Sequence, residues 1–351
     1  MVRSHVLLER LEISGVGDFC DLEVSLVDEV GEPRRWVVFH GEGGMGKTTL
    51  TAVLAGTRPG RCVPLGKSTE AEPCYAAAEW RLGVEEPARP HCLRLLSPNV
   101  ARLGDGAPLQ RKEQALYERI AAGGGGFVFV ELPADRFYGR GAWALSDPLR
   151  TVLRYDVRAA MSAETTRLDL ARQVKQTLAY SSISAALTGD RKGGDDGDPR
   201  RFQATITHVV EEVLRPSDYG FAGLNARTLE PTFIAPSGRR VVFDRLPSFA
   251  KDLLAMVILP TRALWASLPG IDPREAEGVV VIDDPERRLP PRVCEQLSTL
   301  LPSALPGVQW VLMTASSSIA ASSPKGTVFA LRRTGDSEAV QLFCDDLALT
   351  H

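Results

Sequence analysis

A glycine-rich segment near the start of the sequence carries residues suited to hold a polyphosphate. Residues 41–48 read GEGGMGKT and fit the pattern G-x-x-x-x-G-K-[ST]. An apolar run, residues 36–39, precedes this segment, and apolar residues at helical spacing follow it. Glycines leave room for backbone N–H groups to surround several negative charges. The pattern therefore predicts a phosphate-binding loop between a strand and a helix.

The loop and the helix after it have separate expected tasks. The positive end of the helix near Gly46 is expected to attract the phosphates. Lys47 is expected to reach the β- and γ-phosphate oxygens, and the Thr48 hydroxyl to ligate Mg²⁺. A chance glycine-rich turn before Lys-Thr is the alternative, and the flanking strand and helix patterns disfavour it. The expected nucleotide-binding residues are Gly41, Glu42, Gly43, Gly44, Met45, Gly46, Lys47, Thr48 and Thr49.

A second group of candidate residues ends a very apolar run. Residues 278–282 (GVVVI) precede Asp283 and Asp284. Mg²⁺ on a nucleotide usually takes a carboxylate from the protein, and the attacking water needs a group that orients it. Asp283 is therefore a predicted metal ligand with Thr48, and Asp284 is a predicted catalytic residue with Lys47. The alternative is two acids that cap a helix or face solvent, which fits such an apolar run less well.

Apolar patterning predicts the elements that must position these groups. Residues 6–14 and 20–26 alternate apolar and polar side chains, which predicts an antiparallel hairpin. Strands that alternate with helices predict a parallel sheet with its ligand at the carboxyl ends of the strands. Further predicted strands are 75–82, 91–96, 127–132, 233–235, 241–243, 278–282, 308–314 and 327–331. Predicted helices are one around Leu116 and Ile120, 162–188, 201–214 and 249–259, with a Gly/Asp-rich surface loop at 189–200.

The whole composition restricts the class of protein. The chain has 351 residues, 44% of them hydrophobic, enough for a large core in one elaborated α/β domain or in two lobes. A net charge of −3 gives no global reason to expect nucleic acid, although a local basic groove would still allow it. Six scattered cysteines without a C-x-x-C pair disfavour a disulfide framework or a zinc site. No apolar run approaches the roughly 18 residues that span a bilayer, so we expect a cytoplasmic protein with no membrane contact.

Several segments together resemble the soluble ABC-type ATPases. The run VVVIDDPE at 279–286, followed by Leu289-Pro290-Pro291, is similar to the family's "IDEPE-x-x-LHP" segment. Residues 309–314 (QWVLMT) resemble its "QvivTTHSP" strand, and residues 41–50 resemble its Walker A loop. The family includes the overcoming-lysogenization-defect (OLD) proteins, RecF-like and SMC-like heads, and ATPase subunits of bacterial anti-phage systems. The resemblance spans most of the chain, whose length suits a head without long SMC arms.

This resemblance implies a fold, cofactors and partners. The implied fold is an α/β P-loop NTPase, an ABC-ATPase-like head with a mixed sheet, N-terminal antiparallel strands and a helical insertion lobe. Within a single domain over residues 1–351, residues 1–135 and 236–351 would form the nucleotide-binding lobe and 136–235 the mainly helical insertion. ATP and Mg²⁺ are the implied cofactors. A second ATPase head, in a homo- or heterodimer, and a separate effector protein are the implied partners.

Departures from the family pattern concern catalysis more than binding. The catalytic glutamate of the family falls on Asp284, which is one methylene shorter, and its switch histidine falls on Ala315. The signature segment falls on residues 246–251, where Phe249 replaces the glycine and Ala250 the glutamate. No glutamine loop can be assigned. Because a misplacement of ~1 Å can cost on the order of a hundredfold in rate, we expect intact binding with slow hydrolysis.

Three more side chains are weaker candidates. Glu286, two residues beyond Asp284, is a possible substitute for the missing base. Arg136 and Arg140 follow the predicted strand 127–132. They are expected either to approach phosphates or a partner, or to form a solvated basic loop.

Two functional hypotheses follow. The first is an ATP-binding, slowly hydrolysing subunit that switches a partner effector by ATP-driven dimer closure, in anti-phage defence or DNA maintenance. The second is a non-catalytic nucleotide-binding regulatory or scaffold subunit. A transporter motor domain is disfavoured, because the signature and glutamine loop that such motors carry are unrecognisable here.

Overall fold

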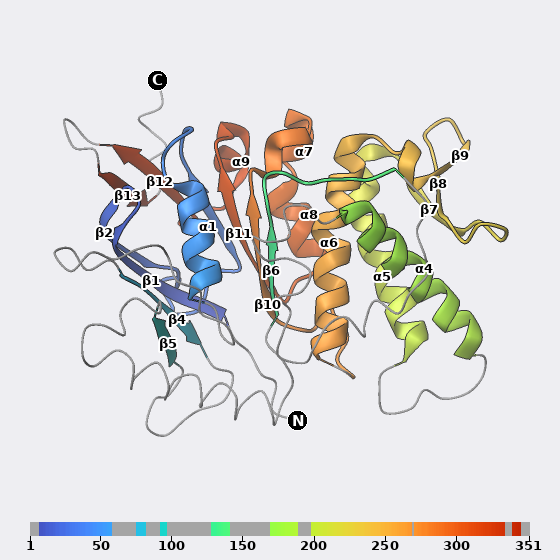
Figure 1. The fold of residues 1–351 in the computed structure, drawn as a ribbon, viewed down its shortest axis with the longest axis horizontal. Helices are drawn as coiled ribbons and strands as arrows, with labels where there is room; N and C mark the ends of the chain where they lie inside the picture. The colour runs from blue at the N-terminus through green and yellow to red at the C-terminus, as the bar shows by residue number, and fades with distance from the viewer. Residues whose placement is uncertain are drawn as a thin grey trace.

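Two β-sheets of different kinds make up the half of the molecule that carries the glycine-rich loop (Figure 1). The structure is a computed structural model and describes residues 7–57, 75–81, 92–96, 128–140, 169–188, 198–268, 270–333 and 339–344. A four-stranded antiparallel sheet, ordered β2-β1-β4-β5, contains β1 (Leu7–Val16), β2 (Phe19–Ser25), β4 (Tyr75–Arg81) and β5 (Cys92–Leu96). A six-stranded sheet, ordered β13-β12-β3-β11-β10-β6, contains β3 (Trp36–His40), β6 (Phe129–Leu132), β10 (Gly278–Asp283), β11 (Val308–Thr314), β12 (Val328–Arg333) and β13 (Val340–Cys344). Neighbouring strands of this second sheet are parallel, except for the antiparallel pair β12 and β13.

The inner strands β10 and β11 of the mixed sheet are buried on both faces, and successive side chains enter two different cores. In β10, Val279 and Val281 belong to a core shared with the antiparallel sheet and with α1 (Lys47–Gly56). Val280 and Ile282 point to the opposite face, into a core shared with the remaining long helices. This alternation follows from the two-residue period of a strand. Two covered faces explain why the strand reads as an unbroken apolar run.

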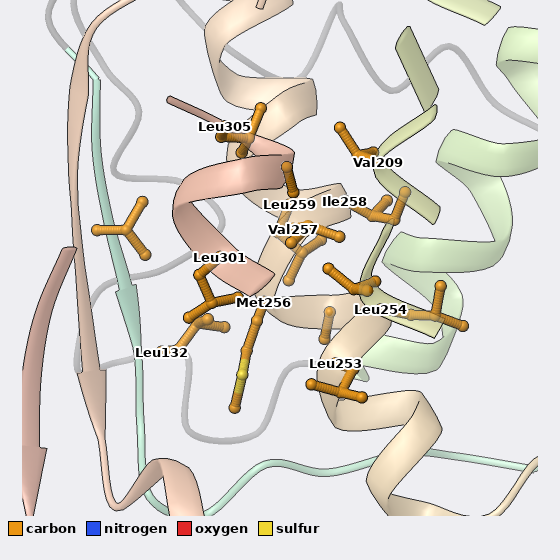
Figure 2. Close-up of a cluster of buried hydrophobic side chains, with 14 of the residues drawn as sticks. Leu132, Val209, Leu253, Leu254, Met256, Val257, Ile258, Leu259, Leu301 and Leu305 are labelled. Atoms are coloured by element: carbon orange, nitrogen blue, oxygen red, sulfur yellow. The ribbon is translucent and has the colours of Figure 1, made fainter. Parts of the chain in front are cut away.

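Helices α6 (Ser248–Ser267) and α8 (Leu297–Ala304) contact the second face of the mixed sheet, and α4 (Leu170–Thr188) and α5 (Pro199–Leu214) pack against α6 and share its core. Helix α6 lies at the centre of this core and is buried along most of its length. Figure 2 shows its apolar side chains, such as Leu254 and Ile258, among those of β6, α5 and α8. The prediction of a helix over 249–259 was too short, because α6 continues through Pro260. A buried proline removes one helical N–H, but the packing around α6 outweighs that loss.

A small three-stranded antiparallel sheet, β7 (Gly220–Leu224), β8 (Pro231–Ile234) and β9 (Arg240–Val242), follows α5. The hairpin predicted at 233–235 and 241–243 is confirmed as the β8–β9 pair. Strands β7 and β13 were not predicted from the sequence. Short helices complete the described chain: η3 (Arg215–Ser217), η4 (Phe243–Arg245), η5 (Pro285–Arg288), α7 (Pro291–Cys294) and α9 (Ser317–Ser322).

One buried glutamine joins the two sheets. Gln309 of β11 is fully buried; its Oε1 accepts from the Leu8 backbone N–H (2.8 Å), and its Nε2 donates to the Leu8 carbonyl (2.9 Å). The same Nε2 donates to the Arg34 carbonyl at 2.9 Å. The amide therefore pairs the backbone of β1 with the mixed sheet, where no strand ladder connects them.

The predicted fold class, a mixed α/β sheet with N-terminal antiparallel strands and a glycine-rich loop after β3, is confirmed. The division of the chain into lobes at residues 135 and 236 stays a prediction. The helix expected around Leu116 and Ile120, residues 162–168 and most of the loop 189–200 lie outside the described residues. Within the described ranges, no helix is long and apolar enough to cross a bilayer.

Candidate functional site

The glycines of the loop form two groups, which differ in whether other atoms pack against the place that a Cβ would take. Gly46 precedes α1 with φ +75°, and a Cβ there would lie 2.6 Å from the ring of Phe19, which is fully buried. At Gly41, a Cβ would lie 3.0 Å from both the Cβ and the carbonyl oxygen of Leu331. Gly43 and Gly44 instead have no atom within 4 Å of such a Cβ. The ends of the loop are thus fixed by packing, while its middle borders open space.

The N-terminus of α1 fits an anion. No side chain caps it, and its first turn contains no acidic residue. The first N–H groups of a helix have no partner within the helix, and the helix dipole favours negative charge at that end. A phosphate group satisfies both conditions.

Lys47 places a positive charge inside the loop. Its Nζ donates to the carbonyls of Gly41 (2.7 Å) and Glu42 (2.9 Å), and the residue is only 9% exposed. The carbonyls of the loop therefore hold the ammonium within the segment that the sequence predicts to bind phosphates. Burial lowers the pKa of His40, just before the loop, which favours its neutral form.

Thr48 and Asp283 meet although 235 positions separate them in the sequence, and the Thr48 hydroxyl donates to Asp283 Oδ2 at 3.2 Å. Strand β11 lies between β3 and β10, so the contact spans the carboxyl ends of three parallel strands. Burial raises the pKa of the Asp283 carboxyl, and the charge of Asp284 raises it further, against the opposing effects of Thr48 and Lys47. A cation bound here would relieve that unfavourable burial of charge.

The donor set fits Mg²⁺ on a nucleotide. Mg²⁺ is usually bound by one or two carboxylates together with phosphate oxygens and water. Asp283 supplies one carboxylate and Thr48 one hydroxyl. No group of three or more His, Cys, Asp or Glu side chains that could hold a metal occurs among the described residues. The site therefore fits an ion that arrives with phosphates.

Asp284 has a constrained backbone. Its φ is +44°, in the left-handed region, its N–H donates to the Met313 carbonyl (2.9 Å), and its own carbonyl accepts from Arg136 Nη2 (2.9 Å). Its side chain does not cap the short helix η5 that follows, so the capping alternative is not what the structure shows for this residue. The carboxylate thus projects from a peptide that β11 and Arg136 fix on both sides.

Glu286 lies against the end of β11. Its Oε2 accepts from Thr314 Oγ1 (2.8 Å) and its Oε1 from the backbone N–H of Ala315 (2.7 Å). Ala315 stands where the motif resemblance in the sequence implies a switch histidine. Both oxygens of Glu286 are thus engaged in joining η5 to β11, which leaves Asp284 as the better candidate for the catalytic carboxylate.

The solvated-loop alternative for Arg136 was wrong, whereas its approach to phosphates or a partner stays a prediction. Arg136 is 1% exposed, and its guanidinium donates to the carbonyls of Pro133, Asp283 and Asp284. It therefore does not form a solvated loop, and it supports the backbone at Asp283 and Asp284. Arg140 is exposed, as the solvated alternative predicts. No signal in the sequence indicates the role of Arg136 beyond its place directly after a buried strand.

Sequence reasoning also missed the residues that support the loop from outside. The β1–β2 turn packs on the start of α1, because a Cβ on Gly17 would lie 3.2 Å from Thr49 Cγ2. Arg333, at the end of β12, pairs with Asp18 of that turn at 2.6 Å, and its Nη2 lies 3.4 Å from the Gly44 carbonyl. No sequence motif marks the two Arg333 contacts, since they join segments more than 280 positions apart.

The segment expected in place of the signature, residues 246–251, leads into and forms the first turn of α6. Ser248 is the first helical residue, and Lys251 Nζ donates to the Asp244 carbonyl at 2.9 Å. The structure thus shows a helix start at this place.

No known protein-family profile matches the chain, and no curated protein is detectably similar to it. Among solved structures, the chain is similar to an SMC head domain from Thermotoga maritima, with 11% identity over 97% of this chain and 99% of that one, and a TM-score of 0.45. It is also similar to an Smc head bound to the C-terminal winged-helix domain of ScpA, with 12% identity, 96% and 97% coverage and a TM-score of 0.49. An Smc head with an extended coiled coil, bound to the C-terminal domain of ScpA derived from Pyrococcus furiosus, gives 12% identity, 96% coverage of both chains and a TM-score of 0.48. The fold assignment rests on this chain's own strand order and phosphate loop, and no functional residue is carried over from these proteins.

Proposed function

We propose that the chain binds ATP with Mg²⁺ at residues 41–49 and hydrolyses it slowly to ADP and phosphate. The contact between Thr48 and Asp283 carries the proposal. A chance glycine-rich turn gives no reason for a buried aspartate at the end of a distant strand to lie 3.2 Å from the threonine hydroxyl. With Lys47 inside the loop, the contact brings together the three side chains that a Mg·nucleotide requires.

Each residue has a proposed task. The backbone of residues 41–49 and the start of α1 surround the phosphates, and Lys47 exchanges its loop carbonyls for β- and γ-phosphate oxygens. Thr48 and Asp283 hold Mg²⁺, which supplies neutralisation of phosphate charge when bound. Asp284 orients the attacking water and accepts its proton.

We expect slow turnover because of two residues at the carboxyl ends of β10 and β11, Asp284 and Ala315. The Asp284 carboxylate is one methylene shorter than that of a glutamate, a retraction of about 1.5 Å. Ala315 offers no side-chain donor to the γ-phosphate; loss of such a donor costs about 3 kcal/mol where donors of this type have been removed. Neither change touches Lys47, Thr48 or Asp283, so affinity for the nucleotide is retained.

The biological role proposed for this activity is switching. Two copies, or one copy and a related head, pair when ATP is bound, and the closed pair signals to a separate effector protein in anti-phage defence or DNA maintenance. The motif resemblance supports this part, as does the reduced catalytic set, because a slow ATPase stays in its ATP-bound form for long periods. We also propose a cytoplasmic location, because the six scattered cysteines suit a reducing compartment.

A second candidate function is a nucleotide-binding regulatory or scaffold subunit that does not hydrolyse ATP. The observation that favours it is the hydrogen bonding of Glu286 to Thr314 and Ala315, which engages both oxygens of the other candidate for the catalytic base. In this case ATP stabilises the fold and is released unchanged.

Phosphate release under multiple-turnover conditions separates the two functions. Wild-type protein, Lys47→Ala and the exposed-lysine control Lys325→Ala are incubated with ATP and Mg²⁺ while light scattering follows the mass. Turnover in the wild type and the control, absent in Lys47→Ala, together with ATP-dependent dimers, supports the switching ATPase. Tight ATP binding without turnover or a change in mass supports the regulatory subunit, and absence of ATP binding contradicts both.

A further inference from the structure

A buried network of charged side chains joins α6 to the end of β10. Asp252, in the second turn of α6, is fully buried, and its Oδ1 accepts from Tyr138 OH (2.6 Å), Arg136 Nε (3.3 Å) and Arg288 Nη1 (3.4 Å). The second oxygen, Oδ2, is buried without a hydrogen-bond partner among the described residues. Two arginines therefore converge on one aspartate, with one acceptor left over.

The guanidinium of Arg136 supplies hydrogen bonds to the chain just beyond the end of the β6–β10 ladder. The β6–β10 pairing stops at Leu132 and Ile282, and the next residue of the β6 chain is Pro133, which has no N–H to donate. Arg136 Nη1 donates to the Asp283 carbonyl at 2.9 Å, and Nη2 donates to the Asp284 carbonyl at 2.9 Å. Arginine supplies these planar, paired donors, whereas lysine does not. The two carbonyls belong to the proposed metal ligand and the proposed catalytic carboxylate.

Arg288 connects the same aspartate to the chain after Asp284. It lies on η5, donates from Nη1 to Asp252 Oδ1 and donates from Nη2 to the Arg136 carbonyl. Its guanidinium also lies 5.4 Å from the centre of the Tyr138 ring. The segment 283–288 is thus held by Arg136 at its start and by Arg288 at its end, and both arginines depend on Asp252 for their counter-charge.

We infer that Arg136 and Asp252 are positioning residues for Asp284, and that they make the place of its carboxylate depend on the first turns of α6. Asp284 has a left-handed backbone, which a non-glycine residue keeps only when its surroundings enforce it. The hydrogen bond from Arg136 to the Asp284 carbonyl holds this backbone on one side. The hydrogen bond from the Asp284 N–H to the Met313 carbonyl holds it on the other. Because residues 246–251 form the start of the same helix, a partner that binds there would act on Asp284 through Asp252. This inference rests on the proposed hydrolysis at Asp284.

Two mild variants test the inference. Asp252→Asn keeps an acceptor but removes the counter-charge, and Tyr138→Phe removes the shortest hydrogen bond to Asp252. Lys175→Gln is the matched control, since Lys175 is 1% exposed and pairs with Asp244 (2.8 Å) and Glu230 (3.3 Å), neither of which belongs to β10 or η5. The measurements, on the full chain, are the dissociation constant for ATP, kcat, and hydrogen–deuterium exchange of the peptide over 283–289.

Asp252→Asn and Tyr138→Phe are expected to lower kcat by about tenfold to a hundredfold, the scale of a misplacement near 1 Å, with an unchanged dissociation constant. Exchange over 283–289 is expected to rise by about tenfold or more in both variants and to stay at the wild-type rate in Lys175→Gln. Exchange and kcat equal to those of Lys175→Gln overturn the inference. If wild-type protein binds ATP but shows no turnover, the proposed hydrolysis fails, and the exchange of 283–289 alone decides whether Asp252 holds this segment. Where Asp252→Asn does not fold, Tyr138→Phe gives the deciding values.

Discussion

The packing of Phe19 on Gly46 predicts a graded response of the loop to added methyl groups. Three variants, Gly43→Ala, Gly44→Ala and Gly46→Ala, add the same Cβ at three places of one loop. Gly43 has ordinary backbone geometry and open space, Gly44 has φ +82° and open space, and Gly46 has φ +75° with the Phe19 ring 2.6 Å from the new atom. The series therefore separates backbone strain from steric overlap.

The magnitudes follow from these two terms. A left-handed backbone costs an alanine about 1–2 kcal/mol relative to glycine. An extra methyl group in a packed core costs about 1–3 kcal/mol more. We expect a loss in the free energy of unfolding of about 0 for Gly43→Ala, about 1–2 kcal/mol for Gly44→Ala and about 2–5 kcal/mol for Gly46→Ala.

Urea unfolding of the nucleotide-free protein, followed by fluorescence and extrapolated linearly to water, measures these differences. The variant Phe19→Leu is the partner for a double-mutant cycle, because a smaller side chain at 19 leaves room for the methyl group at 46. The added cost of Gly46→Ala over Gly44→Ala is expected to shrink in the Phe19→Leu background. Equal costs for Gly44→Ala and Gly46→Ala in the wild-type background would refute the reasoning.

Three further predictions concern single side chains. The folded-state pKa of Asp283 is raised above 3.8, so ionisation of this carboxyl destabilises the fold as the pH rises from 3.8 through that pKa. Asp283→Asn is therefore expected to be more stable than wild type in urea unfolding at pH 7 but not at pH 3. A stability difference that does not depend on pH would contradict this. Gln309→Leu leaves one donor and two acceptors without their partner, and a loss of about 3 kcal/mol or more is expected in the same assay; a loss below about 1 kcal/mol would show that β1 does not need this amide. Arg333→Ala removes an exposed pair with Asp18, and a loss within about 1 kcal/mol is expected, whereas a larger loss would mean that the β1–β2 turn depends on this pair.

Local patterns were enough to predict the parts of the site that lie within one segment. The phosphate loop has a fixed spacing between a strand and a helix, and the run before Asp283 is apolar because both faces of β10 are covered. Each of these signals comes from a few consecutive residues. The meeting of Thr48 with Asp283 followed from the rule that parallel strands bring their carboxyl ends to one edge.

Contacts between distant segments were not predictable in this way. Nothing near Arg136 in the sequence shows that its counter-charge is Asp252, and nothing near Gly46 shows the ring of Phe19. The length of α6 was underestimated because Pro260 reads as a helix end, although the core around it favours continuation. Strand β7 was missed because its sequence, GFAGL, has two glycines and is only half-buried.

The dependence of ATP affinity on Mg²⁺ tests the central claim, that residues 41–48 and Asp283 form one Mg·nucleotide site. Isothermal titration calorimetry of wild-type protein, Thr48→Val and Asp283→Asn, each with Mg²⁺ and with EDTA, measures it. Thr51→Val is the control, because the Thr51 hydroxyl bonds the Lys47 carbonyl within α1 and does not contact Asp283. Wild type and control are expected to bind ATP more tightly with Mg²⁺, and Thr48→Val and Asp283→Asn to lose that difference. Absence of ATP binding by the wild type, or the same Mg²⁺ effect in all four proteins, would contradict the account.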